Sequence, residues 1–281
     1  MILRDYARLD RVGGESGLPH HTHFRSAGEG PPLLALHPSP LSSAFMLPLM
    51  EQISDVVQVI APDTPGYGMS DPLPGQAESL EPYVEWLAAF VRNQGFQSVG
   101  LYGSATGAQI AVEFARRYPE QTRYAVLDNA VHFHEEERRE ILARYFPDMA
   151  PQADGSHLQK AWEMASALFT QFPWYDTSDA ARVDAPQPPL PVVHATALAC
   201  LNSGEDYARA YRAAFMNEDA QRILSITCPV RVIRWAGSVL KKYADRLDGF
   251  DWPEHIKMVH CEATPPQRFA AIRQVVVELS A

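Results

Sequence analysis

Short apolar runs bounded by glycine and proline recur through the first half of the chain and again near its end. Such runs are typical of strands in a mostly parallel sheet, because helices cover both faces of that kind of sheet. The pattern predicts strands at residues 33–36, 56–60, 99–102, 124–127, 230–233 and 256–259.

Between these runs, apolar residues recur with the spacing of an amphipathic helix. Leu80, Tyr83, Leu87 and Phe90 form one such stripe, with the i, i+3, i+4 period of a helix that buries one face. The spacing predicts helices at residues 80–94, 107–118, 135–146, 156–171, 192–203, 205–216 and 266–279. Alternating strands and helices indicate an α/β fold.

A long helical segment interrupts this alternation, since no strand is predicted between residues 131 and 229. We therefore expect a sheet-based core made of residues 1–130 and 223–281, and an inserted helical cap made of residues 131–222. Open α/β sheets bind ligands beyond the carboxyl ends of their strands. The cap is expected to cover that edge of the sheet.

Four short motifs follow one another outside the predicted cap. They read GEGPPLLALHPSP (28–40), APDTPGYGMSD (61–71), LYGSATGA (101–108) and CPVRVI (228–233). In this order they resemble the motifs of the α/β-hydrolase superfamily, in its epoxide-hydrolase-like branch. The resemblance implies the α/β-hydrolase fold, a mostly parallel central sheet with helices on both faces and an inserted helical cap.

The third motif departs from the family at the position that carries its chemistry. The family's nucleophile elbow reads G-x-S-x-G and presents a serine on a tight turn between a strand and a helix. Here the two glycines are Gly103 and Gly107, so Ala105 occupies the serine position and Ser104 precedes it. A methyl group cannot attack a carbonyl carbon. The resemblance therefore implies the fold without its usual serine chemistry.

The other two members of the family's catalytic triad are also absent where spacing places them. The stretch 234–240, after the penultimate strand, contains no carboxylate, and the histidine position falls near Thr264 and Pro265. The oxyanion hole that the resemblance implies depends on backbone N–H groups, here those of Ser39 and Thr106. These donors can stabilise an enolate or a carboxylate even without a nucleophile.

Proton transfer would then need another group, and histidine is the side chain best suited to it near neutral pH. His37 and His260 lie at the ends of predicted strands, and we expect them to border the pocket. Structural support of a loop is the alternative for His37, and a strand-end position is the alternative for His260. His132 and His157 are further candidates from the cap, and exposure to solvent is the alternative for both.

Substrate contacts are predicted from residues next to the elbow and in the cap. Ser104 flanks Ala105, and Trp174 and Tyr175 follow a predicted helix at the expected boundary between cap and sheet. Aromatic side chains at that boundary would line a mainly apolar pocket. We therefore expect these three residues, together with His132 and His157, to contact the substrate.

Composition restricts the partners. The formal net charge of −10 disfavours nucleic acid and anionic lipid. No apolar run approaches the ~20 residues that cross a bilayer, and charges interrupt the N-terminus too early for a signal peptide. The three scattered cysteines suggest neither a zinc site nor a disulfide framework. We expect a cytoplasmic protein without metal or cofactor, whose partner is a small molecule.

Three functions are compatible with these features. The preferred one is an enzyme that acts on a small, mainly apolar or aromatic carbonyl or carboxylate substrate without a serine nucleophile, by lyase-, decarboxylase- or isomerase-like chemistry at the oxyanion hole. One alternative is an ester, lactone, epoxide or C–C bond hydrolase whose nucleophile was replaced by Ala105. The other is a non-catalytic, ligand-binding member of the fold.

Overall fold

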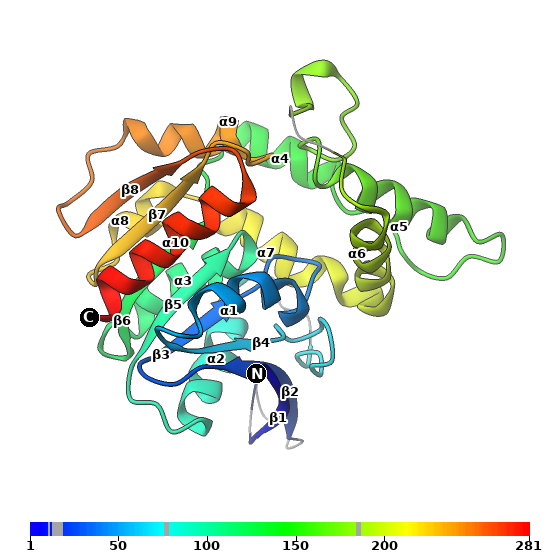
Figure 1. The fold of residues 1–281 in the computed structure, drawn as a ribbon. Coiled ribbons are helices and arrows are strands. Elements are labelled where there is room, and N and C mark those ends of the chain that lie inside the picture. Colours follow the sequence, from blue (N-terminus) through cyan, green and yellow to red (C-terminus); the bar gives the residue numbers. More distant parts are fainter. Residues whose placement is uncertain (11, 13–18, 76–78, 184–186) are drawn as a thin grey trace.

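The computed structural model describes residues 1–10, 12, 19–75, 79–183 and 187–281 (Figure 1). Its centre is an eight-stranded sheet with the strand order β1-β2-β4-β3-β5-β6-β7-β8. The strands are β1 (Leu3–Leu9), β2 (His20–Ala27), β3 (Pro32–Leu36), β4 (Gln58–Pro62), β5 (Val99–Ser104), β6 (Thr122–Asp128), β7 (Val230–Trp235) and β8 (Ile256–Cys261). Strands β3 to β8 pair in parallel, whereas β1 and β2 are antiparallel. The predicted mostly parallel α/β sheet is confirmed.

Helices cover both faces of this sheet. The described helices are α1 (Leu47–Ile53), α2 (Glu81–Asn93), α3 (Thr106–Arg117), α4 (Glu135–Arg144), α5 (Ser156–Ala167), α6 (Leu190–Asn202), α7 (Arg209–Asn217), α8 (Ala220–Leu224), α9 (Lys241–Ala244) and α10 (Pro265–Ser280). Figure 1 shows α1 and α10 on one face and α2 and α3 on the other. Among these described helices, none has both the length and the hydropathy of a membrane-spanning segment.

The apolar runs of the sequence form the middle layer of a three-layer core. Leu34 and Leu36 of β3 pack with the apolar side chains of α2 and α3, whereas Leu33 and Ala35 pack with those of α1 and α10. Successive side chains of a strand point to opposite faces of the sheet, so a strand buried on both faces is apolar at every position. This arrangement explains why the parallel strands could be predicted from uninterrupted apolar runs.

Strands β1 and β2 were not predicted, because their side chains are largely polar. Several polar residues of β2 are nevertheless buried with hydrogen-bond partners. Thr22 Oγ1 accepts the Trp86 indole N–H at 2.8 Å, and His23 Nδ1 lies 2.8 Å from Asp63 Oδ2. Paired polar groups can occupy a core position at little cost, so β2 has no apolar signature in the sequence.

Between β6 and β7 the described chain forms helices α4 to α8. The predicted helix at 205–216 is in fact a 3₁₀ turn, Gly204–Ala208, followed by α7. Figure 1 shows α5 and α6 as a pair that projects away from the sheet. The division of the chain into a core and a cap stays a prediction.

Two glycines allow α3 to begin directly against the sheet. A Cβ atom on Gly103 would lie 2.2 Å from the Gly107 carbonyl oxygen, and one on Gly107 would lie 2.1 Å from the Leu36 carbonyl oxygen. Real Cβ atoms never approach backbone oxygens this closely, so both positions require glycine. The close approach fixes the position of the turn between β5 and α3, which carries Ala105.

Candidate functional site

A cavity of about 570 Å³ lies where the loops at the carboxyl ends of the parallel strands meet segment 131–222. This is the size of a site for a small organic molecule. The loops after β3, β5, β6, β7 and β8 each contribute to its lining. Its wall in segment 131–222 is mainly apolar and contains the aromatic residues Phe133, Tyr145, Phe169, Phe172, Tyr211 and Phe215.

Ala105 lines this cavity from a strained turn. Its backbone angles are φ 48° and ψ −112°, a conformation that costs a non-glycine residue about 1–3 kcal/mol. Hydrogen bonds on both sides hold the turn, since Ala105 N–H donates to the Asp128 carbonyl at 2.9 Å and Gln109 N–H donates to the Ala105 carbonyl at 3.1 Å. In this backbone conformation Ala105 lines the cavity, and Thr106 is the first residue of α3.

Ser39 and Thr106 place polar groups beside Ala105 at the wall of the cavity. Within the described part of the chain, neither backbone N–H donates to a protein acceptor. The hydroxyl oxygens of both residues are enclosed and also have no partner among the described residues. The first N–H groups of a helix have no acceptor within the helix, and the helix dipole favours negative charge there. The two N–H groups are therefore the candidates to bind a ligand oxygen.

The loops after β7 and β8 also reach the cavity, through Ser238 and Thr264. These are the loops in which the resemblance places the triad's acid and histidine. Ser238 Oγ donates to Asn129 Oδ1 at 2.7 Å, and Thr264 Oγ1 donates to Gln267 Oε1 at 2.5 Å. Neither hydroxyl titrates near neutral pH, so the residues that these two loops place on the described lining of the cavity include no general base.

His37 does not border the cavity, contrary to the sequence-based expectation. The imidazole is 1% exposed, and its Nε2 accepts the Thr64 N–H at 2.9 Å while Nδ1 lies 3.1 Å from the Pro38 carbonyl oxygen. Burial lowers the pKa of His37. Both ring nitrogens are occupied in supporting the loop that carries Ser39, which leaves no nitrogen for a ligand.

The other three candidate histidines also lie outside the described lining of the cavity. His260 is part of β8, is largely exposed, and faces Asp248 at 3.6 Å beside a separate surface hollow. His157 Nδ1 accepts the Gln152 N–H at 3.0 Å. His132 Nδ1 accepts the Ala220 N–H at 3.3 Å. The expected histidine acid–base site is therefore not assembled, because each ring has its partners elsewhere.

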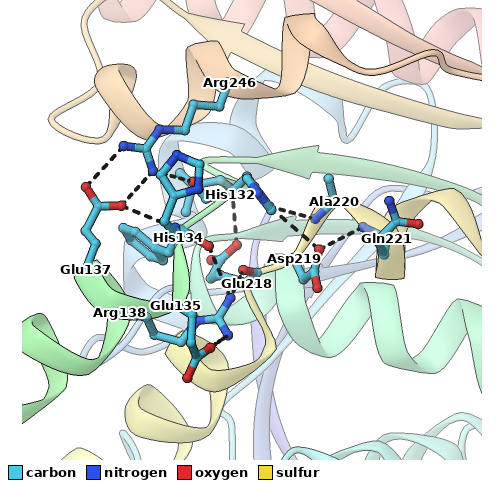
Figure 2. A network of polar contacts seen from close by, with 12 residues as sticks. His132, His134, Glu135, Glu137, Arg138, Glu218, Asp219, Ala220, Gln221 and Arg246 are labelled. Carbon is cyan, nitrogen blue, oxygen red and sulfur yellow. Dashed lines mark hydrogen bonds and ion pairs between the residues drawn. The ribbon is translucent and has the colours of Figure 1, made fainter.

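The lining of the cavity after β6 passes over His132. Val131 and Phe133 line the cavity, whereas His132 and His134 lie outside its described lining. Figure 2 shows these two histidines between the guanidinium groups of Arg138 and Arg246. Arg246 donates to the His132 carbonyl at 3.1 Å and to Glu137 at 2.6 Å, and so fixes this segment.

Trp174 and Tyr175 were expected to contact the substrate, but neither is part of the described lining. The Trp174 indole N–H donates to the Tyr145 carbonyl at 2.8 Å, which buries the ring behind the cavity wall. Tyr175 lies under the Arg144 guanidinium, 4.4 Å from the centre of its ring. Their neighbour Phe172 lines the cavity in their place. Ser104 does line it, and its Oγ accepts Asn129 Nδ2 at 3.4 Å.

Arg268 is a charged group of the lining that sequence reasoning missed. Its Nε and Nη2 donate to Asp128 Oδ2 at 2.9 and 2.6 Å, and its guanidinium stacks on Trp235 at 4.5 Å. Tyr102 O–H donates to the same oxygen at 2.7 Å. In the sequence, Arg268 looks like an ordinary solvated residue in the first turn of the last helix. Only the carboxylate at the end of β6 explains its burial.

Glu218 is the second missed residue, a carboxyl that is 6% exposed and lines the cavity. Burial raises its pKa well above the usual value, although the Val131 N–H, Arg138 and Gln109 act in the opposite direction. In the sequence it precedes Asp219, the N-cap of α8, and reads as part of a solvated helix start. No local pattern distinguishes it from such a residue.

Among the described residues, no group of three or more histidine, cysteine or carboxylate side chains could hold a metal ion. The cysteines Cys200, Cys228 and Cys261 are free thiols. The polar groups that do converge on the cavity are backbone amides, hydroxyls, one ion-paired guanidinium and one buried carboxyl. This set can bind oxygen atoms of a ligand.

Comparison with known proteins gives a family and a fold. The family model described as alpha/beta hydrolase fold matches residues 31–264. A thermophilic esterase from Thermogutta terrifontis, solved with malate bound, superposes with a TM-score of 0.72 over 99% of this chain and 100% of that chain. Its sequence identity is 19%, so this likeness shows the fold alone.

Two sequence relatives come from Shewanella oneidensis. The chain is 31% identical over 100 residues to a pimeloyl-(acyl-carrier protein) methyl ester esterase, and this alignment covers 36% of this chain and 35% of that protein. It is 29% identical over 115 residues to a cis-3-alkyl-4-alkyloxetan-2-one decarboxylase, and this alignment covers 40% of this chain and 36% of that protein. The matches thus span about a third of the length of these curated relatives.

The strain at Ala105 gives a first prediction. Glycine adopts a positive φ readily, so Ala105→Gly is expected to raise the free energy of unfolding by about 1 kcal/mol, the difference between released strain and lost chain entropy. Ala270 is an exposed residue in the middle of α10, and Ala270→Gly should lower stability by about 1 kcal/mol. Urea denaturation of both variants measures the two signs. A loss of stability in both would show that Ala105 is not strained.

Glu218 gives a pH-dependent prediction. Below its ordinary pKa of 4.5 the carboxyl is protonated in both the folded and the unfolded chain. At higher pH only the unfolded chain ionises, so stability falls by about 1.4 kcal/mol per pH unit until the pH passes the raised folded pKa. Glu218→Gln removes this loss, and its stability advantage over wild type should grow as pH rises above 4.5.

Glu278 provides the matched control for this pH series. Its hydrogen bond from Arg231 lowers its pKa in the folded protein. Its contribution to stability is therefore present above the unfolded pKa and is lost as pH falls through the folded pKa. Glu278→Gln should thus become less stable than wild type as pH rises, opposite in sign to Glu218→Gln. The same sign in both variants would contradict the assignment of Glu218.

Proposed function

This chain belongs to the alpha/beta hydrolase fold family, and on that premise we propose that its cavity binds a small, mainly apolar or aromatic compound carrying a carbonyl or carboxylate group. The ligand's oxygen accepts hydrogen bonds from the N–H groups of Ser39 and Thr106. The apolar part lies against the aromatic wall. No covalent bond to the protein forms, because Ala105 replaces the nucleophile.

One observation carries this proposal. The backbone N–H groups of Ser39 and Thr106, which have no acceptor among the described residues, belong to the wall of a largely apolar cavity that also contains a strained turn. A backbone held at φ 48° persists only where the surrounding structure over-determines it, and such positions cluster at ligand sites. On this proposal, the two amides bind the ligand oxygen as an oxyanion hole does, without a nucleophile beside them.

Binding can be tested with 4-phenylbutanoate, which combines an aromatic group with one carboxylate. Leu168→Trp narrows the cavity, because Leu168 lines it, and should weaken binding about 10-fold or more, a loss of at least about 1.4 kcal/mol. Leu158 is an exposed residue of α5 outside the described lining, so Leu158→Trp should bind as wild type does. Isothermal titration calorimetry measures the three affinities. Equal weakening in both variants, or no binding to wild type, would reject the cavity as the site.

A second candidate function is non-covalent catalysis of the lyase or decarboxylase type. The observation that favours it is that the Thr106 and Ser39 amides are fixed before any ligand arrives, as donors that stabilise a developing oxyanion must be. Similarity to a decarboxylase over 40% of the chain is consistent with it. Loss of carbon dioxide from a β-keto acid creates an enolate oxygen that such donors would stabilise.

The probe 3-oxo-3-phenylpropanoate distinguishes this candidate from simple binding. Decarboxylation gives carbon dioxide and an enolate, which takes up a proton to form acetophenone. An enzyme should release acetophenone faster than the spontaneous reaction, and Leu168→Trp should abolish the excess rate. A wild-type rate equal to the spontaneous rate, with the probe bound, would leave binding as the function.

A further inference from the structure

Glu218 is a buried carboxyl group whose two oxygens have different surroundings. Oε2 accepts the Gln109 side-chain N–H at 2.5 Å and the Val131 backbone N–H at 3.1 Å. Oε1 has no hydrogen-bond partner among the described residues, and it is not one of the fully enclosed oxygens that lack a partner. Glu218 lines the cavity, and Oε1 is the carboxyl oxygen that remains free for a ligand there.

The carboxyl lies close to the strained turn. Gln109, whose side chain donates to Oε2, lies in α3 four residues after Ala105. Its backbone N–H donates to the Ala105 carbonyl. Four residues of α-helix rise about 6 Å. Val131, the other partner of Oε2, also lines the cavity. Glu218, Ser39 and Thr106 therefore line one and the same cavity.

No cation contacts this carboxyl in the described chain. The guanidinium of Arg138 donates instead to the Glu218 backbone carbonyl at 2.7 Å and to the Glu135 carboxylate at 3.2 Å (Figure 2). Two further titratable groups of the neighbouring segments, His132 and Asp219, face each other at 3.6 Å, and Tyr211 shares a hydrogen bond with Tyr145. An unpaired buried carboxylate is strongly unfavourable, so the group remains neutral. Both donors approach Oε2, which leaves the proton on Oε1.

We propose that Glu218 is the second polar anchor of the cavity, and that its protonated Oε1 donates a hydrogen bond to an acceptor oxygen of the ligand. This inference rests on the proposed function, in which a first ligand oxygen binds the amides of Ser39 and Thr106. It narrows the ligand to apolar or aromatic compounds with two oxygen acceptors a few bonds apart, the class of the keto acids.

Two probes that differ in one oxygen test the assignment. They are 4-oxo-4-phenylbutanoate and 4-phenylbutanoate, and calorimetry at weakly acidic pH gives the affinity of each. Wild type should prefer the keto acid about 10-fold, the effect of one hydrogen bond to a buried donor. Glu218→Met removes the donor and should abolish the preference. Glu218→Gln should keep it, because Gln109 and Val131 hold the amide oxygen and direct the NH₂ group into the cavity.

The pH dependence separates the role of Glu218 from that of its neighbours. The preference of wild type for the keto acid should fall as pH rises and Glu218 ionises, whereas in Glu218→Gln it should stay constant. His132, Arg138 and Asp219 are unchanged in that variant, so their titration cannot produce the difference. A preference with the same pH profile in both proteins would overturn the inference.

The outcomes separate this inference from the proposed function. If both probes bind wild type equally, or if Glu218→Met keeps the preference, Glu218 is not the anchor although the cavity is the binding site. If neither probe binds wild type, the proposed function and this inference fail together. An infrared band of a protonated carboxyl in ligand-free wild type, absent from Glu218→Gln, is the expected ligand-independent result. Its absence from wild type would overturn the inference even if Glu218→Met did not fold.

Discussion

The turn between β5 and α3 is the constraint on which the rest of the site depends. It is possible only because Gly103 and Gly107 lack side chains where a Cβ would collide with the backbone of α3 and of β3. Ala105 then takes a backbone conformation that costs about 1–3 kcal/mol. Thr106 at the start of α3 and Ser39 in the loop after β3 then both line the cavity. A relaxed turn would direct these amides elsewhere.

Asp128 connects this turn to the distant parts of the chain. Its backbone carbonyl accepts the Ala105 N–H, while its carboxylate accepts Tyr102 from β5 and Arg268 from α10. A buried carboxylate is tolerated because the guanidinium makes two hydrogen bonds to it. One residue at the end of β6 thus fixes the strained turn and the position of the last helix at the same time.

A methyl group at position 105 leaves the polar contacts of the cavity to the neighbouring residues. In a triad the histidine is the general base, but in the described chain every candidate imidazole is occupied or faces away from the cavity. Hydroxyls, the Asn129 carboxamide, the ion-paired Arg268 and the buried carboxyl of Glu218 line the cavity, in an apolar surrounding that strengthens each hydrogen bond.

The sequence by itself determined the parallel strands, most helices and the location of the turn at Ala105. These features follow from local periodicity and from glycine spacing, which are properties of short segments. The tertiary structure alone decided which polar side chains face the cavity. Glu218 meets Gln109 across 109 positions, and Arg268 meets Asp128 across 140. Contacts between segments so far apart cannot be recognised in a local sequence pattern. His37 and His260 were expected at the cavity only because each follows a predicted strand, and a position at the end of a strand does not decide which way the side chain points.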